Sequence, residues 1–327
     1  MPRTFTTDRG DRTLRLDQVI VRHLGEVPRL SRTKVQRWIA EGLVQVNGRL
    51  PARASSPVAV GDRVEVSGDE AMAERAAPQA EAQALDIIFE DAALLALNKP
   101  AGVVVHPSYK HAAGTLFNGI LGHLGHTGPA GDDTPRLVHR LDKDTSGVLL
   151  VSKQLAVHRV LQRSLGDGRA AKTYLAVVHG TPRPVQGAIS LPLGVDPLDR
   201  RRVAVQEGGS PSETRYERIA HGDGFSLMRC RLVTGRMHQI RVHLAASGWP
   251  IVGDQVYGRQ GDAFPRQALH AWRLAIPHPV TGNPLELTAP LPGDMGQLCA
   301  TLGLAPPSAW PGRPGGRIKD LGPVPTG

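Results

Sequence analysis

Residues 138–153 read VHRLDKDTSGVLLVSK, a charged loop followed directly by an apolar run. The apolar part, Gly147–Ser152, has the composition of a buried strand, and the helical pattern of Gln154–Leu165 comes next. A polar loop that is anchored by a rigid strand is a common place for catalytic side chains. On composition alone, however, an ordinary charged turn remains the simpler explanation of this loop.

Strands and helices surround this stretch without the regular alternation of a parallel α/β fold. Asp86–Phe89 and Leu94–Asn98 precede it as predicted strands, and Tyr174–Val178 follows it. Glu213–Ala220 and Phe225–Val233 flank a Gly-Asp-Gly turn, which predicts an antiparallel hairpin. We therefore predict the α+β class for this part of the chain.

The first 68 residues read as a small basic module, with 12 Lys or Arg against 7 Asp or Glu. Apolar residues recur at helical spacing from Leu16 to Leu24, and Ser31 is a good N-cap for a second helix. The segments 43–46 and 60–66 are predicted strands, and Asn47-Gly48 is a hairpin-turn signal. The module is thus expected to combine two helices with a small sheet.

The second helix of this module carries most of its candidate RNA contacts. Its apolar residues point into the small core, and a solvated charged helix is the plain alternative for the opposite face. The run LSRTKVQRWIAEGLVQVNGRL, followed by VGDRVEV, resembles the RNA-binding module named after a small-subunit ribosomal protein. That resemblance implies that the basic helix docks on RNA phosphates. The residues expected to make these contacts are Arg29, Arg32, Lys34 and Arg37.

The length and composition fit a cytoplasmic protein of two domains that acts on a polyanion. The 327 residues carry a formal net charge of +9, which fits a partner rich in phosphates and, equally well, an enzyme whose surface is simply basic. The polar start is unlike a signal peptide, no apolar run is long enough to span a bilayer, and two cysteines fit a reducing compartment. We expect the basic module at 13–68, a linker at 69–84, a large domain at 85–300 and a Pro/Gly-rich tail at 301–327.

The charged loop gains a specific meaning from a resemblance. HRLDKDTSGVLLVSK resembles the signature of the RluA-type pseudouridine synthases, and other blocks of that family stand in the same order along the chain. The resemblance covers about residues 13–292 and implies a mixed, largely antiparallel sheet. It also implies isomerisation of uridine to pseudouridine, mostly in large-subunit ribosomal RNA. The other matching blocks are Asn98–Pro107, Lys172–Ala176, Leu232–His243, Gly253-Asp254, Tyr257-Gly258, Leu269–Ala271 and Thr288–Pro290.

The resemblance also gives roles to individual residues. Asp142 matches the catalytic aspartate of the family, Arg241 the arginine that pairs with it, and Tyr174 the tyrosine that stacks on the base. A carboxylate beside the anomeric carbon can stabilise positive charge, attack the carbon or remove a neighbouring proton. The target uridine must be flipped out of folded RNA, and Arg140 resembles an arginine that fills the gap. Further contacts to RNA or to the loop are expected from His139, Arg236 and His238.

One position departs from the family pattern. Relatives often carry a lysine just before the strand that begins near Thr214, where this chain reads Gly209-Ser210-Pro211-Ser212. A phosphate contact is therefore in doubt at this point, whereas the reaction is not.

Other functions fit the sequence less well than the isomerisation that the resemblance implies. Asp144 could form a glycosidase-like pair with Asp142, but we expect it to order the turn. An RNA-binding assembly protein without catalysis would be expected to lack part of the Asp142, Tyr174 and Arg241 set. A Ser/His hydrolase lacks its G-x-S-x-G elbow, and His238 with His243 fits no zinc-site spacing. The isomerisation imports no group, so we expect no cofactor and no metal, and we take a monomer as the starting expectation.

Overall fold

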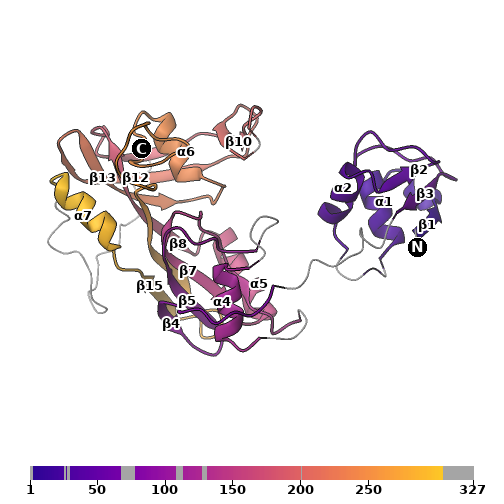
Figure 1. Ribbon diagram of the computed structural model, residues 1–327, viewed down its shortest axis with the longest axis horizontal. Helices are drawn as coiled ribbons and strands as arrows, with labels where there is room; N and C mark the ends of the chain where they lie inside the picture. The colour runs from indigo at the N-terminus through magenta and orange to yellow at the C-terminus, as the bar shows by residue number, and fades with distance from the viewer. Residues whose placement is uncertain are drawn as a thin grey trace. The chain divides into compact units, whose positions relative to one another are not determined.

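The computed structural model describes residues 3–25, 27, 30–67, 78–107, 113–126, 131–199 and 201–304. The chain divides into two units, Met1–Ala77 and Pro78–Gly327 (Figure 1). Arg29, residues 69–77 of the predicted linker and residues 305–327 of the predicted tail lie outside the described residues. Within the described ranges, no helix has both the length and the apolar character needed to cross a membrane.

The small unit packs two helices against a three-stranded sheet of order β1-β3-β2. The predicted cap of the second helix is present, because Oγ of Ser31 accepts a hydrogen bond from the backbone N of Lys34 at 3.2 Å. We did not expect β1, which pairs antiparallel with β3 and adds a strand ahead of residue 13. The elements are β1 (Arg3–Thr6), a 3-10 helix (Arg9–Asp11), α1 (Leu16–His23), α2 (Arg32–Ala40), β2 (Val44–Val46) and β3 (Arg63–Val66).

The large unit is built on one sheet of ten strands. Eight of them follow the order β4-β5-β7-β14-β8-β13-β12-β9, while β15 pairs with β14 and β6 pairs with β7. A separate hairpin is formed by β10 and β11. The strands are β4 (Ile87–Glu90), β5 (Leu94–Lys99), β6 (Arg136–Leu137), β7 (Ser146–Ser152), β8 (Ala171–His179), β9 (Gln186–Ser190), β10 (Leu193–Val195), β11 (Val203–Val205), β12 (Glu213–Gly222), β13 (Phe225–Leu232), β14 (Leu269–Pro277) and β15 (Pro284–Thr288).

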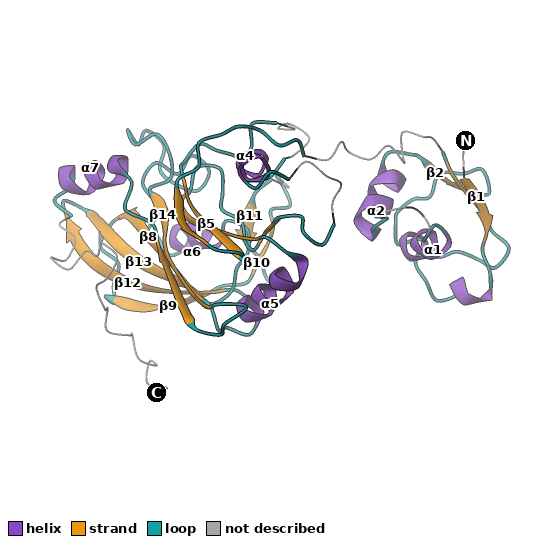
Figure 2. Cartoon of the chain, turned by 90° about the horizontal axis from the view of Figure 1, so that it is seen from below, coloured by secondary structure: helices purple, strands orange, loops and turns teal. Residues whose placement is uncertain are grey.

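Helices cover both faces of this sheet, which explains why its central strands are apolar throughout. Leu149 and Val151 of β7 pack into one cluster with α4 (Leu116–His123), α6 (Gln239–Ala246) and α7 (Gly293–Thr301). The alternate residues Val148 and Leu150 pack into another cluster with α5 (Leu155–Gly166). Figure 2 shows α4 and α5 on opposite sides of the layer of strands. Successive side chains of a strand point to opposite faces, so a strand covered on both sides reads as one apolar run.

The predicted α+β class and the largely antiparallel sheet are confirmed. In the sheet of the large unit, β7 and β14 pair in parallel, whereas the other pairings described are antiparallel. At the parallel contact Gly147 lies opposite Ala271 with a φ of +115°, and a Cβ on Gly147 would come within 2.1 Å of the carbonyl oxygen of Ala271. Glycine is therefore required where the charged loop enters the sheet.

Candidate active site

The loop that carries Asp142 joins β6 to β7, and hydrogen bonds from a buried lysine to its backbone hold it in place. The backbone N of Thr145 donates to the carbonyl oxygen of Asp142 at 3.1 Å, which closes a turn. Lys99, at the end of β5, is fully buried, and its Nζ donates to the carbonyl oxygens of Pro100 (2.7 Å), Lys143 (2.7 Å) and Thr145 (2.9 Å). Buried carbonyl groups need such donors, so the ammonium group holds the turn in one conformation.

The carboxylate of Asp142 is held by Arg241, which lies in the first turn of α6. Nη1 of Arg241 donates to Oδ2 of Asp142 at 2.9 Å. The other side of the guanidinium forms a bidentate ion pair with Asp254. Nε donates to Oδ2 at 2.6 Å, and Nη2 donates to Oδ1 at 2.8 Å. The side chain of Asp254 is fully buried and that of Arg241 is 6% exposed, whereas that of Asp142 is 20% exposed. The guanidinium thus connects a buried carboxylate with one that faces solvent.

The pairing of Arg241 with Asp254 keeps both groups charged despite their burial. Burial works to lower the pKa of Arg241, but its pairs with Asp254 and Asp142 outweigh burial and raise that pKa. Burial works to raise the pKa of Asp254, and the hydrogen bonds from Arg241 again outweigh it, so this pKa lies below its ordinary value. An ion pair of this kind is stable in a protein interior only when each charge is paired and hydrogen-bonded.

His238 lies beside Asp142 and is oriented by a tyrosine. Its Nε2 is 3.8 Å from Oδ1 of Asp142, and its Nδ1 is 2.8 Å from Oη of Tyr257. Because Tyr257 Oη already accepts a hydrogen bond from the backbone N of Val203 at 2.9 Å, its proton is free to be donated to Nδ1 of His238. Burial lowers the pKa of His238, so the ring is neutral and its Nε2–H faces the carboxylate.

The walls of the site include an aromatic ring and a neutral imidazole. Tyr174 on β8 is 7% exposed, and burial together with the charge of Asp142 raises the pKa of its hydroxyl. Its ring is therefore an uncharged surface on which a base can stack. His139 accepts a hydrogen bond at Nε2 from the backbone N of Leu150 at 3.2 Å, and burial lowers its pKa to about 4. His139 is thus neutral and ties the charged loop to β7.

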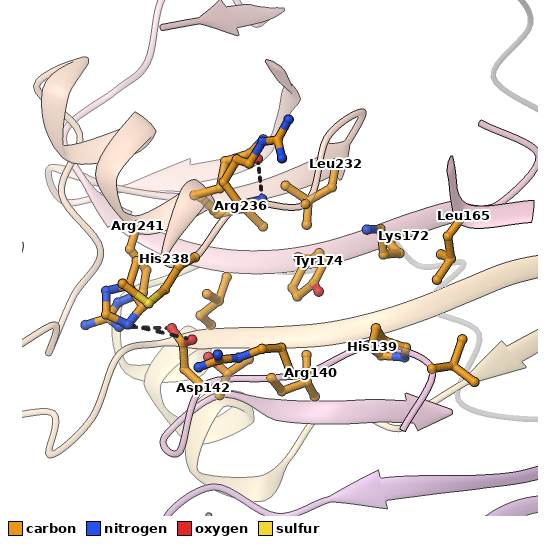
Figure 3. A pocket seen from close by; sticks show the side chains of 18 of the residues that line it. His139, Arg140, Asp142, Leu165, Lys172, Tyr174, Leu232, Arg236, His238 and Arg241 are labelled. Carbon is orange, nitrogen blue, oxygen red and sulfur yellow. Dashed lines mark hydrogen bonds and ion pairs between the residues drawn. The ribbon is translucent and has the colours of Figure 1, made fainter. Parts of the chain in front are cut away.

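These side chains line a pocket of about 570 Å³ (Figure 3), which is large enough for a nucleotide-sized ligand. Arg140 and Arg236 are exposed at this pocket, and Figure 3 shows Tyr174 between Asp142 and Lys172. The structure therefore brings seven predicted site residues to one place, although they come from three distant parts of the chain. The seven are His139, Arg140, Asp142, Tyr174, Arg236, His238 and Arg241.

Asp144, the rival carboxylate, lines a second cavity of about 880 Å³ that shares Arg140, Asp142 and Arg241 with the first. The turn at this point is held through the backbone of Asp144, whose carbonyl oxygen accepts a hydrogen bond from Nη1 of Arg266 at 3.2 Å.

His243 uses Nδ1 with Thr214 and Nε2 with Leu191, so neither nitrogen is free for a metal.

Comparisons with known proteins bear on the family of this chain. A model of the RNA pseudouridylate synthase family matches residues 93–246. A Bacillus subtilis protein named Uncharacterized RNA pseudouridine synthase YlyB is 42% identical over 274 residues, which are 83% of this chain and 89% of that protein. The chain belongs to the RNA pseudouridine synthase family. It is an enzyme that isomerises uridine in RNA, and the site described above is its candidate active site.

Further relatives support both units of this pseudouridine synthase. The Nitrosomonas europaea protein named Ribosomal large subunit pseudouridine synthase D is 39% identical over 307 residues, covering 90% of this chain and 86% of that protein. A solved structure titled Human RNA Pseudouridylate Synthase Domain Containing 1 has a TM-score of 0.54 at 27% identity, covering 68% of this chain and 96% of its own. A model of the S4 domain matches residues 14–64, so the small unit contains an RNA-binding S4 domain.

Several residues that shape the candidate active site of the synthase received no role from the sequence. Asp254 accepts hydrogen bonds from Arg241, Lys99 supports the turn, and Tyr257 orients His238. Each of the three lies within a sequence block that resembles the family, and this was the available signal. Nothing in the sequence of these blocks shows which backbone or side chain each residue contacts. The predicted RNA contacts Arg32, Lys34 and Arg37 lie on α2 of the small unit.

Proposed function

We propose that this synthase isomerises a uridine of large-subunit ribosomal RNA, with Asp142 as the catalytic carboxylate. The observation that carries the proposal is the hydrogen bond between Arg241 and Asp142 in a pocket whose wall includes Tyr174. The substrate is inferred from relatives whose names specify the large ribosomal subunit, such as the proteins of Nitrosomonas europaea and Salmonella typhimurium, at 39% and 36% identity.

Asp142 acts at the anomeric carbon of the flipped uridine. Breaking the bond from this carbon to N1 of uracil leaves positive character on the sugar, which an ionised carboxylate stabilises by charge, by attack or by removing a neighbouring proton. Arg241 places a positive charge beside Asp142 and aims one of its oxygens, and the two hydrogen bonds with Asp254 prevent the guanidinium from turning away. Pre-orientation of this kind lowers the barrier because no reorganisation is needed during the reaction.

The remaining residues of the pocket hold the flipped nucleotide. The ring of Tyr174 stacks on the uracil while the base is detached and turns, and its raised pKa makes it a stacking surface rather than a proton acceptor at neutral pH. Arg140 is exposed at the pocket and fills the place that the flipped base leaves in the RNA stack. Arg236 and His238 complete the contacts with the RNA, and His139 supports the loop.

The small unit docks on RNA through the exposed face of α2. The side chains of Arg32 and Arg37 are each 50% exposed, and Lys34 packs its chain over the ring of Trp38, with Nζ 5.6 Å from the ring centroid. Lys34 and Arg37 are three residues apart and share one face of α2, whereas Arg32 also pairs with Asp17. Positive side chains on such a face attract phosphates without reading the base sequence. We further propose that the synthase acts in the cytoplasm, where ribosomes are found, as a monomer without a cofactor.

The decisive experiment changes Asp142→Asn, which keeps the size of the side chain and removes its charge. We expect pseudouridine formation on ribosomal RNA to become undetectable, while RNA affinity changes less than about 3-fold, because the pocket and the basic residues remain. Asp144→Asn is the matched control two residues away and should retain turnover. Retained turnover in Asp142→Asn would overturn the assignment of the catalytic carboxylate. Mapping of pseudouridines in cells with and without the gene tests the substrate.

A further inference from the structure

Lys172 is the charged residue of the pocket that the reaction described above does not use. It lies on β8 two residues before Tyr174, so the two side chains share one face of the strand and start about 7 Å apart. Lys172 lines the pocket, and a Cβ on Gly235 would come within 2.9 Å of its Nζ. A side chain at position 235 would therefore clash with the ammonium group of Lys172.

The ammonium group of Lys172 has no acceptor among the described residues of the chain. It takes part in no ion pair or hydrogen bond there, unlike Lys99, whose three donors are all used. Lys172 is half-buried, and burial lowers its pKa. His139 lines the same pocket, and the charge of Lys172 helps to lower its pKa, so this neutral imidazole offers no negative charge to pair with. A half-buried ammonium without a partner is costly, which points to a ligand atom as the missing acceptor.

The position of Lys172 indicates which part of the substrate supplies that acceptor. Figure 3 shows Asp142 and Arg241 on one side of Tyr174 and Lys172 on the other, with the nitrogen of Lys172 turned toward the Tyr174 side. In the proposed function, the sugar carbon lies at Asp142 and the uracil lies on Tyr174. The edge of the base opposite the sugar then points away from Asp142 and toward Lys172. In uridine this edge carries the carbonyl oxygen O4.

Resting on the proposed function, we propose that Lys172 binds the carbonyl oxygen of uracil opposite the sugar and stabilises the negative charge of the detached base. When the bond between the anomeric carbon and N1 breaks, its electron pair leaves with uracil, and the charge is shared by N1, O2 and O4. A new bond then forms from C5 to the anomeric carbon. C5 loses its proton to solvent and N1 gains one, so no atom is imported, and Lys172 keeps its own protons.

This contact also suits the turning of the base. A half turn of uracil about the axis through N3 and C6 exchanges N1 with C5 and O2 with O4. The oxygen opposite the sugar is therefore O4 in uridine and O2 in pseudouridine, at the same place. One ammonium group can hold the base before and after the turn. Cytosine carries an amino group there, and a donor facing a donor leaves both unpaired, so Lys172 also selects uracil.

The test compares Lys172→Met with Lys172→Arg in single-turnover reactions of the full-length protein. For Lys172→Met we expect a rate lower by about 10²–10³-fold. We expect RNA affinity and its salt dependence to stay as in the wild type, and the melting temperature not to fall, because no partner is lost. Lys172→Arg should recover part of the rate and move the alkaline limb of the pH profile upward. Arg169→Met, at an exposed arginine outside the pocket lining, serves as the matched control.

Substitution in the RNA identifies the atom that is bound. With 4-thiouridine at the target position, the wild-type rate should fall, because sulfur is a weaker acceptor than oxygen, and the rate of Lys172→Met should fall no further. The proposal is overturned if Lys172→Met keeps the wild-type rate, or if it loses affinity and salt dependence instead, as loss of a phosphate contact would predict. The activity of Asp142→Asn is measured independently, so failure of the Lys172 proposal leaves the proposed function intact, and the two failures are distinguishable.

Discussion

Nη1 of Arg241 donates a hydrogen bond of 2.9 Å to Oδ2 of Asp142 across a sequence separation of 99 residues. The arginine belongs to the first turn of α6, and the aspartate belongs to the loop before β7. Because the other two donor nitrogens of the guanidinium hold Asp254, the position of Arg241 does not depend on Asp142. The catalytic carboxylate that we propose is thus aimed by a cation that is already fixed in the protein.

Asp254→Asn is expected to impair both stability and turnover. The substitution leaves the buried guanidinium of Arg241 with one charged partner instead of two, and breaking a buried pair typically costs about 3–5 kcal/mol. A displaced Arg241 no longer aims Asp142, and a displacement of this kind lowers the rate by about 100-fold. Chemical denaturation and single-turnover rates at saturating RNA measure the two effects separately.

The control for this substitution is Asp199→Asn, which breaks a pair of similar geometry at the surface, where the Arg201 side chain is 86% exposed. Its carboxylate accepts hydrogen bonds of 2.9 Å from both Nε and Nη2 of Arg201. Exposed pairs contribute little to stability, so the melting temperature and turnover should stay as in the wild type. An Asp254→Asn variant that behaves like this control would contradict the view that Asp254 fixes Arg241.

His270 is expected to make the protein less stable at acidic pH. The buried imidazole contacts Oγ of Ser146 through Nδ1 at 2.9 Å and the carbonyl oxygen of Ala289 through Nε2 at 3.3 Å, and burial lowers its pKa to about 4. The unfolded chain takes up a proton on this ring near pH 6.5, whereas the folded chain does so near pH 4. The free energy of unfolding should therefore fall as the pH is lowered through this window, by up to about 3 kcal/mol.

Urea denaturation at pH 7 and pH 5 measures this effect. His270→Asn should reduce the pH dependence without abolishing it, because His139, whose pKa is also about 4, acts in the same direction. His221→Asn, at an exposed position of β12, should leave the dependence as it is in the wild type. An unchanged pH dependence in His270→Asn would show that this imidazole does not couple folding to protons.

The basic face of α2 is expected to set the salt dependence of RNA binding. With Lys34→Gln and Arg37→Gln combined in the full-length chain, affinity should fall, and the slope of log K against log salt should become smaller by about two, because each phosphate contact contributes about one. Ribosomal RNA fragments titrated at several salt concentrations provide the measurement.

Arg63→Gln is the control for the α2 variant. Arg63 lies exposed on β3, beside the buried Val64, so its side chain points to the sheet face opposite the core that the helices cover. It should alter the salt slope less than the α2 variant does. Equal effects of both variants would mean that the unit attracts RNA by its overall charge and not by the α2 face.

The sequence alone determined most of the local structure, and its resemblance to a known family supplied the main candidate site residues. The structure confirms three predictions that depend on short-range signals. They are the cap at Ser31, the buried strand before α5 and the hairpin of β12 with β13. Asp142, Tyr174 and Arg241 became candidates because HRLDKDTSGVLLVSK and the later blocks resemble a known family. Periodicity and capping act over a few residues, so they can be read without knowing the rest of the fold.

Only the tertiary structure decided which groups meet across the chain. It placed Asp254 behind Arg241, Lys99 beneath the turn and β1 beside β3, and it left Lys172 beside Tyr174 without an acceptor in the described chain. Contacts of this kind depend on how distant segments pack, and the same residue types fit many partners equally well. A charged side chain in a sequence does not reveal its partner, because burial and pairing are properties of the folded chain.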